Sequence, residues 1–299
     1  MSIRYTGFAD EAADGIRGQI AATLELGWKS IESRAIDGAN ITDIDDAKFD
    51  EVAGALEDSG VRIDCFGSAI ANWGKDPRKE EDFQGSLAEL GRAVPRMRKL
   101  GTTMLRGMSF GVVRDAIPDS PEVEKLVVEK LRALVRICED AGIVYLHENC
   151  MNFGGMSWEH TLRLVEAIPS PAFALAFDTG NPVFTFDRRG APPYALQSAW
   201  EFYKNVRPFI RHVHIKDGVY VGPSDGLFPM TRYTWPGEGN GDVLRIVSDL
   251  KASGYDGFLS IEPHMQTVFH EGSGRSPEEE RSATYVEYGR RLMDLVARS

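Results

Sequence analysis

The sequence predicts an α/β protein of the (β/α)₈ TIM-barrel class, with residues 1–299 forming a single domain. Helical stretches end at a glycine and are followed by a short apolar run at five places, namely Gly27, Gly60, Gly101, Gly142 and Gly254. The first four glycines are 33, 41 and 41 residues apart, which is typical of successive strand–helix units. No linker divides the chain, and no GxGxxG or phosphate-loop motif follows a strand, so an open nucleotide-binding sheet is disfavoured.

Eight segments have the apolar content and the bounding turns of strands. They are residues 3–9, 30–34, 61–66, 103–108, 143–148, 173–178, 211–215 and 258–262. Helices are expected between them, because glycine adopts the left-handed conformation at a helix end at little cost. The last helix is the best marked: Ser276 supplies an N-cap, Pro277 the first turn and Glu279 a capping-box carboxylate.

Two connections, 181–193 and 218–241, are too long to be simple turns. Long connections in a compact domain are usually functional or disordered. Their aromatic residues favour a lid or a pocket wall over disorder. These are Phe184 and Phe186 in the first connection, and Phe228, Tyr233 and Trp235 in the second.

Composition restricts the partners that we expect. The net charge of −11 disfavours non-specific binding to nucleic acids and to anionic membranes. Residues 1–11 contain no apolar run, and the three cysteines include no CxxC pair, so we expect reduced thiols and a cytoplasmic location. A small molecule is the expected partner, and homo-oligomer formation is left open.

Alternation along the seventh predicted strand puts His212, His214 and Lys216 on one face and Val213 and Ile215 on the other. A lone histidine at such a position is more often a hydrogen-bonded core residue than a metal ligand. In the sixth predicted strand, residues 173–178, the same alternation puts the bulky apolar residues on one face, which should contact the helices. Two alanines and Asp178 lie on the other face.

Glu148, Asp178, His214 and Glu262 lie at the ends of four neighbouring predicted strands. Barrel enzymes carry their active sites at the carboxyl ends of the strands. Three carboxylates at this end would repel one another unless a cation neutralised them, and oxygen ligands with one imidazole suit Mn²⁺, Mg²⁺ or Co²⁺. The structural alternative is that the acids cap helices or form ion pairs with Lys216, Arg34 and Arg106.

The chain resembles the xylose isomerase-like barrel superfamily of sugar isomerases, epimerases and dehydratases over nearly its whole length. The motifs that carry the resemblance are Tyr145-Leu-His-Glu-Asn149, Ala176-Phe-Asp-Thr-Gly-Asn181, His212-Val-His-Ile-Lys-Asp-Gly218, Pro236-Gly-Glu-Gly239 and Ile261-Glu-Pro-His264. The resemblance implies that Glu148, Asp178, His214 and Glu262 ligate one divalent metal, first of all Mn²⁺, with Mg²⁺, Co²⁺ or Zn²⁺ as alternatives. It also implies that Glu148 and Glu262 act as acid and base on opposite sides of a carbohydrate substrate.

The expected reaction is proton abstraction beside the carbonyl of a sugar or keto-sugar through a metal-stabilised enediolate. Returning the proton gives epimerisation or isomerisation, which is our first expectation. Loss of water or an alkoxide, as in a dehydratase or lyase, is the second. A DNA-repair enzyme of the endonuclease IV type is a remote alternative, because such enzymes use many more histidine ligands and this chain has six histidines. A catalytically silent sugar-binding barrel is disfavoured by the intact ligand set.

Two motifs depart from those of ketose 3-epimerases, which typically have Asp-x-x-His and His-x-Gly-Glu-x-x-Arg. Here the corresponding segments read Asp178-Thr-Gly-Asn181 and His214-Ile-Lys-Asp-Gly218. The second is more similar to the inosose dehydratase branch, in which the lysine can donate to a substrate oxygen. We therefore predict a catalytic role for Lys216, with a salt bridge to Asp217 or Asp178 as the alternative.

Other polar and aromatic residues near strand ends are candidates for sugar contacts, although each could equally form a structural ion pair, a cap or a packing contact. The predicted substrate-binding residues are Glu32, Arg34, Arg106, Asn181, Trp235 and His264. His212 and Asp217 are expected to lie behind the ligands and support them. Trp73 could stack on a sugar or pack, and His147, His160 and His270 are expected to be structural or solvated.

Overall fold

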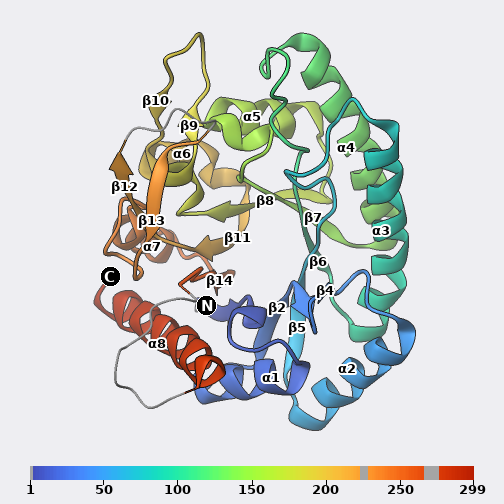
Figure 1. Cartoon of the computed structure of the whole chain (residues 1–299), viewed down its shortest axis with the longest axis vertical. Coiled ribbons are helices and arrows are strands. Elements are labelled where there is room, and N and C mark those ends of the chain that lie inside the picture. Colours follow the sequence, from blue (N-terminus) through green and yellow to red (C-terminus); the bar gives the residue numbers. More distant parts are fainter. Residues whose placement is uncertain (1–2, 223–227, 266–275) are drawn as a thin grey trace.

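The computed structural model describes residues 3–222, 228–265 and 276–299, and its centre is a nearly closed barrel of eight parallel strands (Figure 1). The strands follow one another around the barrel in chain order. They are β1 (Arg4–Gly7), β2 (Ser30–Ser33), β5 (Arg62–Gly67), β6 (Met104–Gly107), β7 (Val144–Glu148), β8 (Phe173–Asp178), β11 (Ile210–Ile215) and β14 (Phe258–Ile261). β1 pairs with β14, and a single parallel bridge between Phe8 and Glu32 links the start of the chain to β2. The predicted fold class is confirmed, with strand ends within a few residues of those expected.

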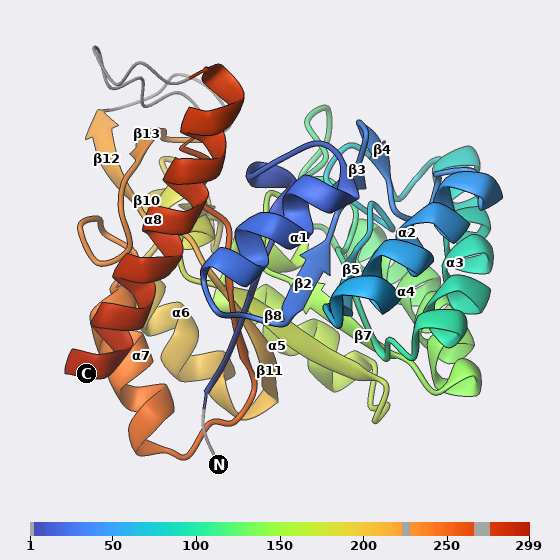
Figure 2. The ribbon, with the colours of Figure 1, turned by 90° about the horizontal axis from the view of Figure 1, so that it is seen from below.

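Helices cover the outside of the barrel (Figure 2). They are α1 (Ile16–Glu25), α2 (Asp46–Ser59), α3 (Glu80–Leu100), α4 (Pro121–Ala141), α5 (Trp158–Ala167), α6 (Ala199–Val206), α7 (Val243–Ala252) and α8 (Pro277–Arg298). All five predicted glycine stops have a positive φ, between 69° and 74°. The predicted capping box of α8 is present, because the Ser276 side chain accepts from the Glu279 amide and the Glu279 side chain accepts from the Ser276 amide. No helix in the described ranges is long and apolar enough to cross a membrane.

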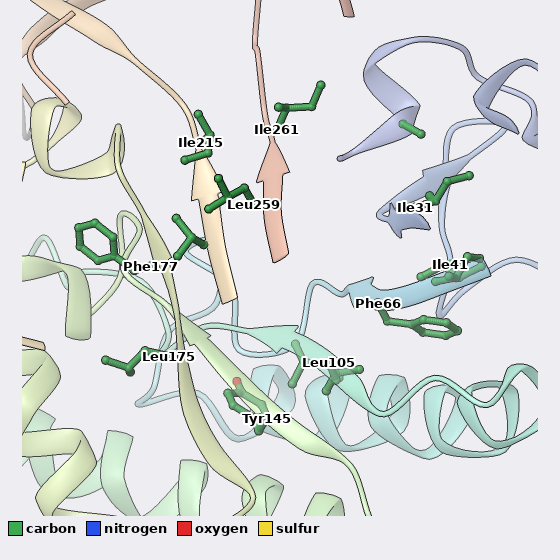
Figure 3. Close-up of a cluster of buried hydrophobic side chains, with 14 of the residues drawn as sticks. Ile31, Ile41, Phe66, Leu105, Tyr145, Leu175, Phe177, Ile215, Leu259 and Ile261 are labelled. Carbon is green, nitrogen blue, oxygen red and sulfur yellow. The ribbon is translucent and has the colours of Figure 1, made fainter. Parts of the chain in front are cut away.

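The strands sort their side chains as the alternation predicts. Leu175, Phe177 and Ile215 point outward into the apolar layer between the barrel and the helices (Figure 3). The inward face of β8 carries Ala174 and Ala176, which form a small separate cluster with Cys65 and Leu146 inside the barrel. Such small residues leave space inside the barrel for the larger polar side chains of other strands.

Three short antiparallel hairpins extend from the carboxyl ends of the barrel strands. They are β3 (Ala35–Ile36) with β4 (Ala39–Asn40), β9 (Phe186–Asp187) with β10 (Ala195–Leu196), and β12 (Gly218–Gly222) with β13 (Met230–Tyr233). The β12–β13 hairpin lies within the predicted connection 218–241, whereas the β9–β10 hairpin begins in the predicted connection 181–193 and ends just beyond it. The rings of Phe184 and Tyr233 stack with centroids 4.7 Å apart, so these two connections contact each other.

Candidate metal and sugar site

The side chains of Glu148, Asp178, His214 and Glu262 meet at the carboxyl end of the barrel. One ligand atom from each lies within 4.8 Å of the others, and all four side chains are buried. The strand register explains part of this meeting, because His214 on β11 pairs directly with Asp178 on β8. The structure therefore brings together all four residues that the sequence predicts as ligands.

The His214 ring is held from inside the barrel by Glu32. Its Nε2 lies 3.2 Å from Glu32 Oε1, and His212 Nε2 lies 2.7 Å from Glu32 Oε2. On its other side, His214 Nδ1 faces Glu148 Oε1 at 3.5 Å and Asp178 Oδ2 at 4.0 Å. Metal-binding histidines commonly donate their second N–H to a carboxylate in this way, which fixes the ring and the ligating nitrogen.

This arrangement corrects our expectation for Glu32, which we predicted to contact a substrate. Its side chain is fully buried in the barrel, and each of its carboxylate oxygens faces an imidazole. Burial alone would raise the pKa of Glu32, but His214 and His212 hold it well below the usual value. Burial would also lower the pKa of His214, yet Glu32 and Glu148 raise it to about 10. His212 lies behind His214, where we expected it.

Glu148 is oriented by two neighbouring side chains. Arg106 Nε lies 3.3 Å from its Oε2, and Asn181 Nδ2 donates to its Oε1 at 3.0 Å. Burial raises the pKa of Glu148, but Arg106 and His214 outweigh burial and hold the pKa below the usual value. Glu148 is therefore a carboxylate whose orientation and ionisation are both set by its neighbours.

Glu262 lies among three cationic or ionisable groups, those of Lys216, Arg34 and His264. Lys216 Nζ is 2.8 Å from its Oε2, while Arg34 Nη1 and His264 Nε2 lie 2.9 Å and 3.2 Å from its Oε1. Lys216 Nζ also lies 3.0 Å from Asp178 Oδ2, so it bridges two of the predicted ligands. Burial raises the pKa of Glu262, but Lys216 and His264 hold it well below the usual value.

The pairing of Lys216 with Asp178, and of Arg34 and Arg106 with the glutamates, shows that the structural alternative considered above is present as ion pairs. These pairs do not satisfy every ligand atom. Glu148 Oε2, Asp178 Oδ2 and His214 Nδ1 are buried and form no hydrogen bond with the described residues. Glu148 Oε2 and Asp178 Oδ2 each face a cation at 3.3 Å and 3.0 Å without a hydrogen bond, and His214 Nδ1 lies 3.5 Å from its nearest carboxylate oxygen. Three buried polar atoms with unused hydrogen-bonding capacity therefore converge here, which is costly.

The four residues fit a divalent cation. Three carboxylates and one imidazole nitrogen form a donor set suited to Mn²⁺, Mg²⁺ or Co²⁺, and no cysteine belongs to it. The three atoms that form no hydrogen bond lie where such an ion would accept their lone pairs. His214 would ligate through Nδ1, because its Nε2 faces Glu32.

A cavity of about 540 Å³ opens beside these residues. Arg34, Arg106, Asn181, Lys216 and His264, all predicted from the sequence to act on or bind substrate, line it. The aromatic residues of its wall include Trp73, Phe184, Phe228 and Tyr233. Phe228 and Tyr233 come from the connection predicted as a lid or pocket wall, and Phe184 comes from the other long connection.

Two further expectations were wrong. Trp235 does not line the cavity; its ring packs 6.0 Å from that of Tyr288 and under the Arg291 guanidinium at 4.1 Å, both on α8. Asp217 does not contact the predicted ligands in the described residues. Its carboxylate accepts four backbone amides, those of Gly218, Gly237, Gly239 and Gly241.

Sequence reasoning missed Asp10 and Glu11, which lie in a short 3₁₀ turn, Ala9–Glu11, shortly after β1. Asp10 Oδ2 lies 2.8 Å from Arg34 Nε, and Glu11 Oε1 lies 3.2 Å from both Arg34 Nη2 and His264 Nδ1. Their position after a strand end was the signal that could have found them. The missed polar lining residues, Asn40, Ser68, Asn72 and Thr231, lie just beyond strand ends or in the hairpins.

The other histidines are structural where the structure describes them. His147 faces away from the cavity and bonds to Ser109 Oγ at 2.9 Å. His160 Nδ1 lies 2.7 Å from the Oγ of Ser157, the N-cap of α5. His270 lies outside the described residues.

A family model described as a xylose isomerase-like TIM barrel matches residues 20–297. The chain belongs to this family. It is 32% identical over 165 residues to a 2-epi-5-epi-valiolone 7-phosphate 2-epimerase of Actinoplanes sp., which covers 55% of this chain and 52% of that protein. It is 25% identical over 190 residues to an inosose dehydratase of Clostridium beijerinckii, with 59% of each chain covered. The chain thus spans between half and three fifths of the length of these two curated relatives.

Among solved structures, this xylose isomerase-like barrel is similar to a family member from Mycobacterium smegmatis determined in complex with magnesium. The TM-score is 0.66 at 18% identity, with 98% of this chain and 97% of that chain covered. At this identity the similarity shows the shared fold. The two curated relatives named above are an epimerase and a dehydratase.

Proposed function

We propose that this protein is a divalent-metal-dependent isomerase or epimerase of a sugar or keto-sugar. The observation that carries the proposal is the convergence of Glu148, Asp178, His214 and Glu262, with three buried atoms that form no hydrogen bond, at the side of a polar cavity. A divalent ion held there would supply positive charge that stabilises the negative oxygen formed when a neighbouring carbon loses its proton. The epimerase among the relatives supports the same reaction class.

In this proposal Glu148 and Glu262 exchange protons with the substrate. Neighbouring cations keep both carboxylates ionised, so either can act as the base that removes the proton beside the carbonyl. Asn181 and Arg106 fix the orientation of Glu148, and Arg34 and His264 fix that of Glu262. For inversion, the opposite carboxylate would first take a proton from solvent and deliver it to the other face of the carbon, while the first carboxylate later releases the proton that it removed to solvent. Delivery of the removed proton by the same carboxylate to the adjacent carbon would isomerise the sugar.

Lys216 favours a second candidate, a dehydratase or lyase. Its ammonium lies at the cavity wall between Asp178 and Glu262, at 3.0 Å and 2.8 Å. An ammonium at this position can donate a proton to a departing hydroxyl or alkoxide on the carbon next to the one that loses its proton. The inosose dehydratase among the relatives supports this alternative.

Incubation with ketoses and a keto-inositol in D₂O, with and without Mn²⁺, tests both candidates. Deuterium at the carbon beside the carbonyl, without loss of water, supports the isomerase or epimerase. Formation of an unsaturated ketone or diketone supports the lyase. Exchange at the same rate without Mn²⁺, in protein stripped with a chelator, would contradict the metal-dependent mechanism.

A further inference from the structure

Every cation that lines the cavity in the described residues is already ion-paired. Arg34 contacts Asp10, Glu11 and Glu262, whereas Arg106 contacts Glu148. Lys216 contacts Asp178 and Glu262, and the partly buried His264 lies 3.2 Å from both Glu11 Oε1 and Glu262 Oε1. These contacts are between buried or half-buried groups, where partners are expensive to separate.

The carboxylates of this cluster outnumber its permanent cations. Arg34, Arg106 and Lys216 face five carboxylates, those of Asp10, Glu11, Glu148, Asp178 and Glu262. The formal excess is two negative charges, which one divalent ion would balance. Among the residues that the structure describes, a phosphate or carboxylate group on the ligand would therefore meet no unpaired permanent cation in the cavity, at a cost in desolvation.

The loops that most often hold phosphate in barrels of this kind follow the seventh and eighth strands. The loop after β11 presents Phe228, Thr231 and Tyr233 to the cavity, and residues 266–275 of the loop after β14 lie outside the described residues. Arg232, between the last two, is exposed and does not line the cavity, as alternation along β13 requires. Phosphate recognition usually relies on an unpaired arginine, a lysine or converging backbone amides.

The remaining wall suits an uncharged polyhydroxylated molecule. Asn72 Nδ2 and Thr231 Oγ1 form no hydrogen bond with the described residues in the structure, so they are available to hydroxyl groups. Trp73, Phe184, Phe228 and Tyr233 supply flat apolar surfaces of the kind on which the C–H face of a sugar ring packs. Uncharged donors and acceptors with aromatic walls are the usual means of orienting a neutral ligand.

We infer that the substrate is a neutral sugar or cyclic polyol ketone without a phosphate or carboxylate group. This inference rests on the proposed function, since it specifies the carbohydrate that the same cavity binds. It separates this protein from the similar epimerase, whose name specifies a 7-phosphate. Positive charge in the cavity serves to hold the catalytic carboxylates rather than to bind an anionic substrate.

Matched pairs of ketoses and their phosphate esters test the inference. The pairs are D-fructose with its 6-phosphate, D-tagatose with its 6-phosphate, and D-xylulose with its 5-phosphate. Binding is measured by calorimetry with metal-free and with Mn²⁺-loaded protein, and deuterium exchange is measured with the loaded protein. We expect at least one neutral ketose to bind and exchange, and its ester to have an at least tenfold weaker affinity in both forms of the protein.

Glu11→Gln provides a second measurement on the charge balance. It removes one negative charge beside Arg34 and His264, so the preference for the neutral member of each pair should shrink at least threefold. Asp14→Asn is the matched control, because Asp14 is an exposed carboxylate that pairs with Arg281 at the surface and does not line the cavity. In this control the preference should not change.

The possible results separate the inference from the function on which it rests. An ester that binds or exchanges as well as its neutral ketose overturns the inference and leaves the proposed function standing. If no member of any pair binds or exchanges, and the keto-inositol also fails, the proposed function is contradicted and the inference with it. A preference that is the same in Glu11→Gln, Asp14→Asn and the unmodified protein contradicts the charge argument.

Discussion

The two halves of the barrel contribute different kinds of group to the site. The later strands β7, β8, β11 and β14 end in the candidate ligands Glu148, Asp178, His214 and Glu262. The earlier strands and the residues that follow them supply Glu11, Glu32, Arg34 and Arg106, each of which contacts a candidate ligand or one of its partners. The later half thus presents the groups that we propose for chemistry, and the earlier half supports them by charge together with Lys216 and His264 of the later half.

The largest expected effect is loss of a ligand from the later half. Glu262→Gln removes a charge that we assign both to metal binding and to proton transfer, so kcat should fall by about 10³-fold or more. Metal content after gel filtration, measured by atomic emission, should fall as well. Unchanged metal content together with unchanged activity would remove Glu262 from the proposed mechanism.

Arg34→Gln is the matched change in the earlier half, because Arg34 contacts Glu262 through one N–H and two other carboxylates through the rest. If Arg34 only positions Glu262, kcat should fall by about tenfold and metal content should be retained. A fall in kcat and in metal content as large as that expected for Glu262→Gln would contradict the assignment of Arg34 to a supporting role.

An intermediate effect is expected for Glu32→Gln, which leaves the cavity lining intact and weakens the hold on His214. Metal affinity, measured by calorimetry, should fall by about 10- to 100-fold, as is usual when the partner of a metal-binding histidine is lost. His212→Gln removes the other imidazole beside Glu32 and should have a smaller effect. Equal metal affinities in Glu32→Gln and the unmodified protein would show that His214 needs no support from β2.

The smallest effect on function is expected from His160, a buried residue in the first turn of α5 that does not line the cavity. Burial, together with Arg163, lowers its pKa to about 4, against an ordinary value of 6.5. In the unfolded chain the His160 imidazole is protonated below about pH 6.5, whereas in the folded chain it is protonated only below about pH 4. The free energy of unfolding therefore decreases as the pH falls from 6.5 to 4. The contribution should be about 2 kcal/mol between pH 7 and pH 5.

Urea unfolding at pH 7 and pH 5 measures this contribution. In His160→Gln the loss of stability between the two pH values should be smaller than in the unmodified protein by about the same amount, while exchange activity at pH 7 should stay unchanged. An identical pH dependence in both proteins would show that His160 is protonated as readily in the folded as in the unfolded chain.

Much of the fold and the candidate ligand set could be predicted because both depend on local patterns. The glycine stops, the capping box at Ser276 and the alternation in β8 and β11 each follow from a few consecutive residues. Strand ends place side chains at one end of a barrel without any knowledge of long-range contacts. His214 and the three carboxylates were found by that rule.

The misassigned residues depend on contacts that no local pattern contains. Glu32 meets His214 from a strand 182 positions earlier, and its depth in the barrel follows from strand tilt and register. Trp235 lies in a loop whose direction is set by packing against α8. The contacts of Glu11 with Arg34 and His264 join residues far apart in the sequence, and they follow from the closure of the barrel between β1, β2 and β14.

The carboxylate of Asp217 has a consequence for how this protein could be remodelled. This carboxylate accepts hydrogen bonds from four glycine amides, three of which lie in the segment 236–241. These bonds hold the segment in one conformation, and we call it the base of the β12–β13 hairpin. A side chain at Gly239 or Gly241 would put its Cβ within 3.0 Å of that carboxylate, so the base tolerates little variation. In the hairpin above it, Met230 is exposed and Thr231 is partly exposed. Under the proposed function, we expect exchange of residues in this hairpin to alter substrate preference while the base and the candidate ligands of the barrel stay as they are.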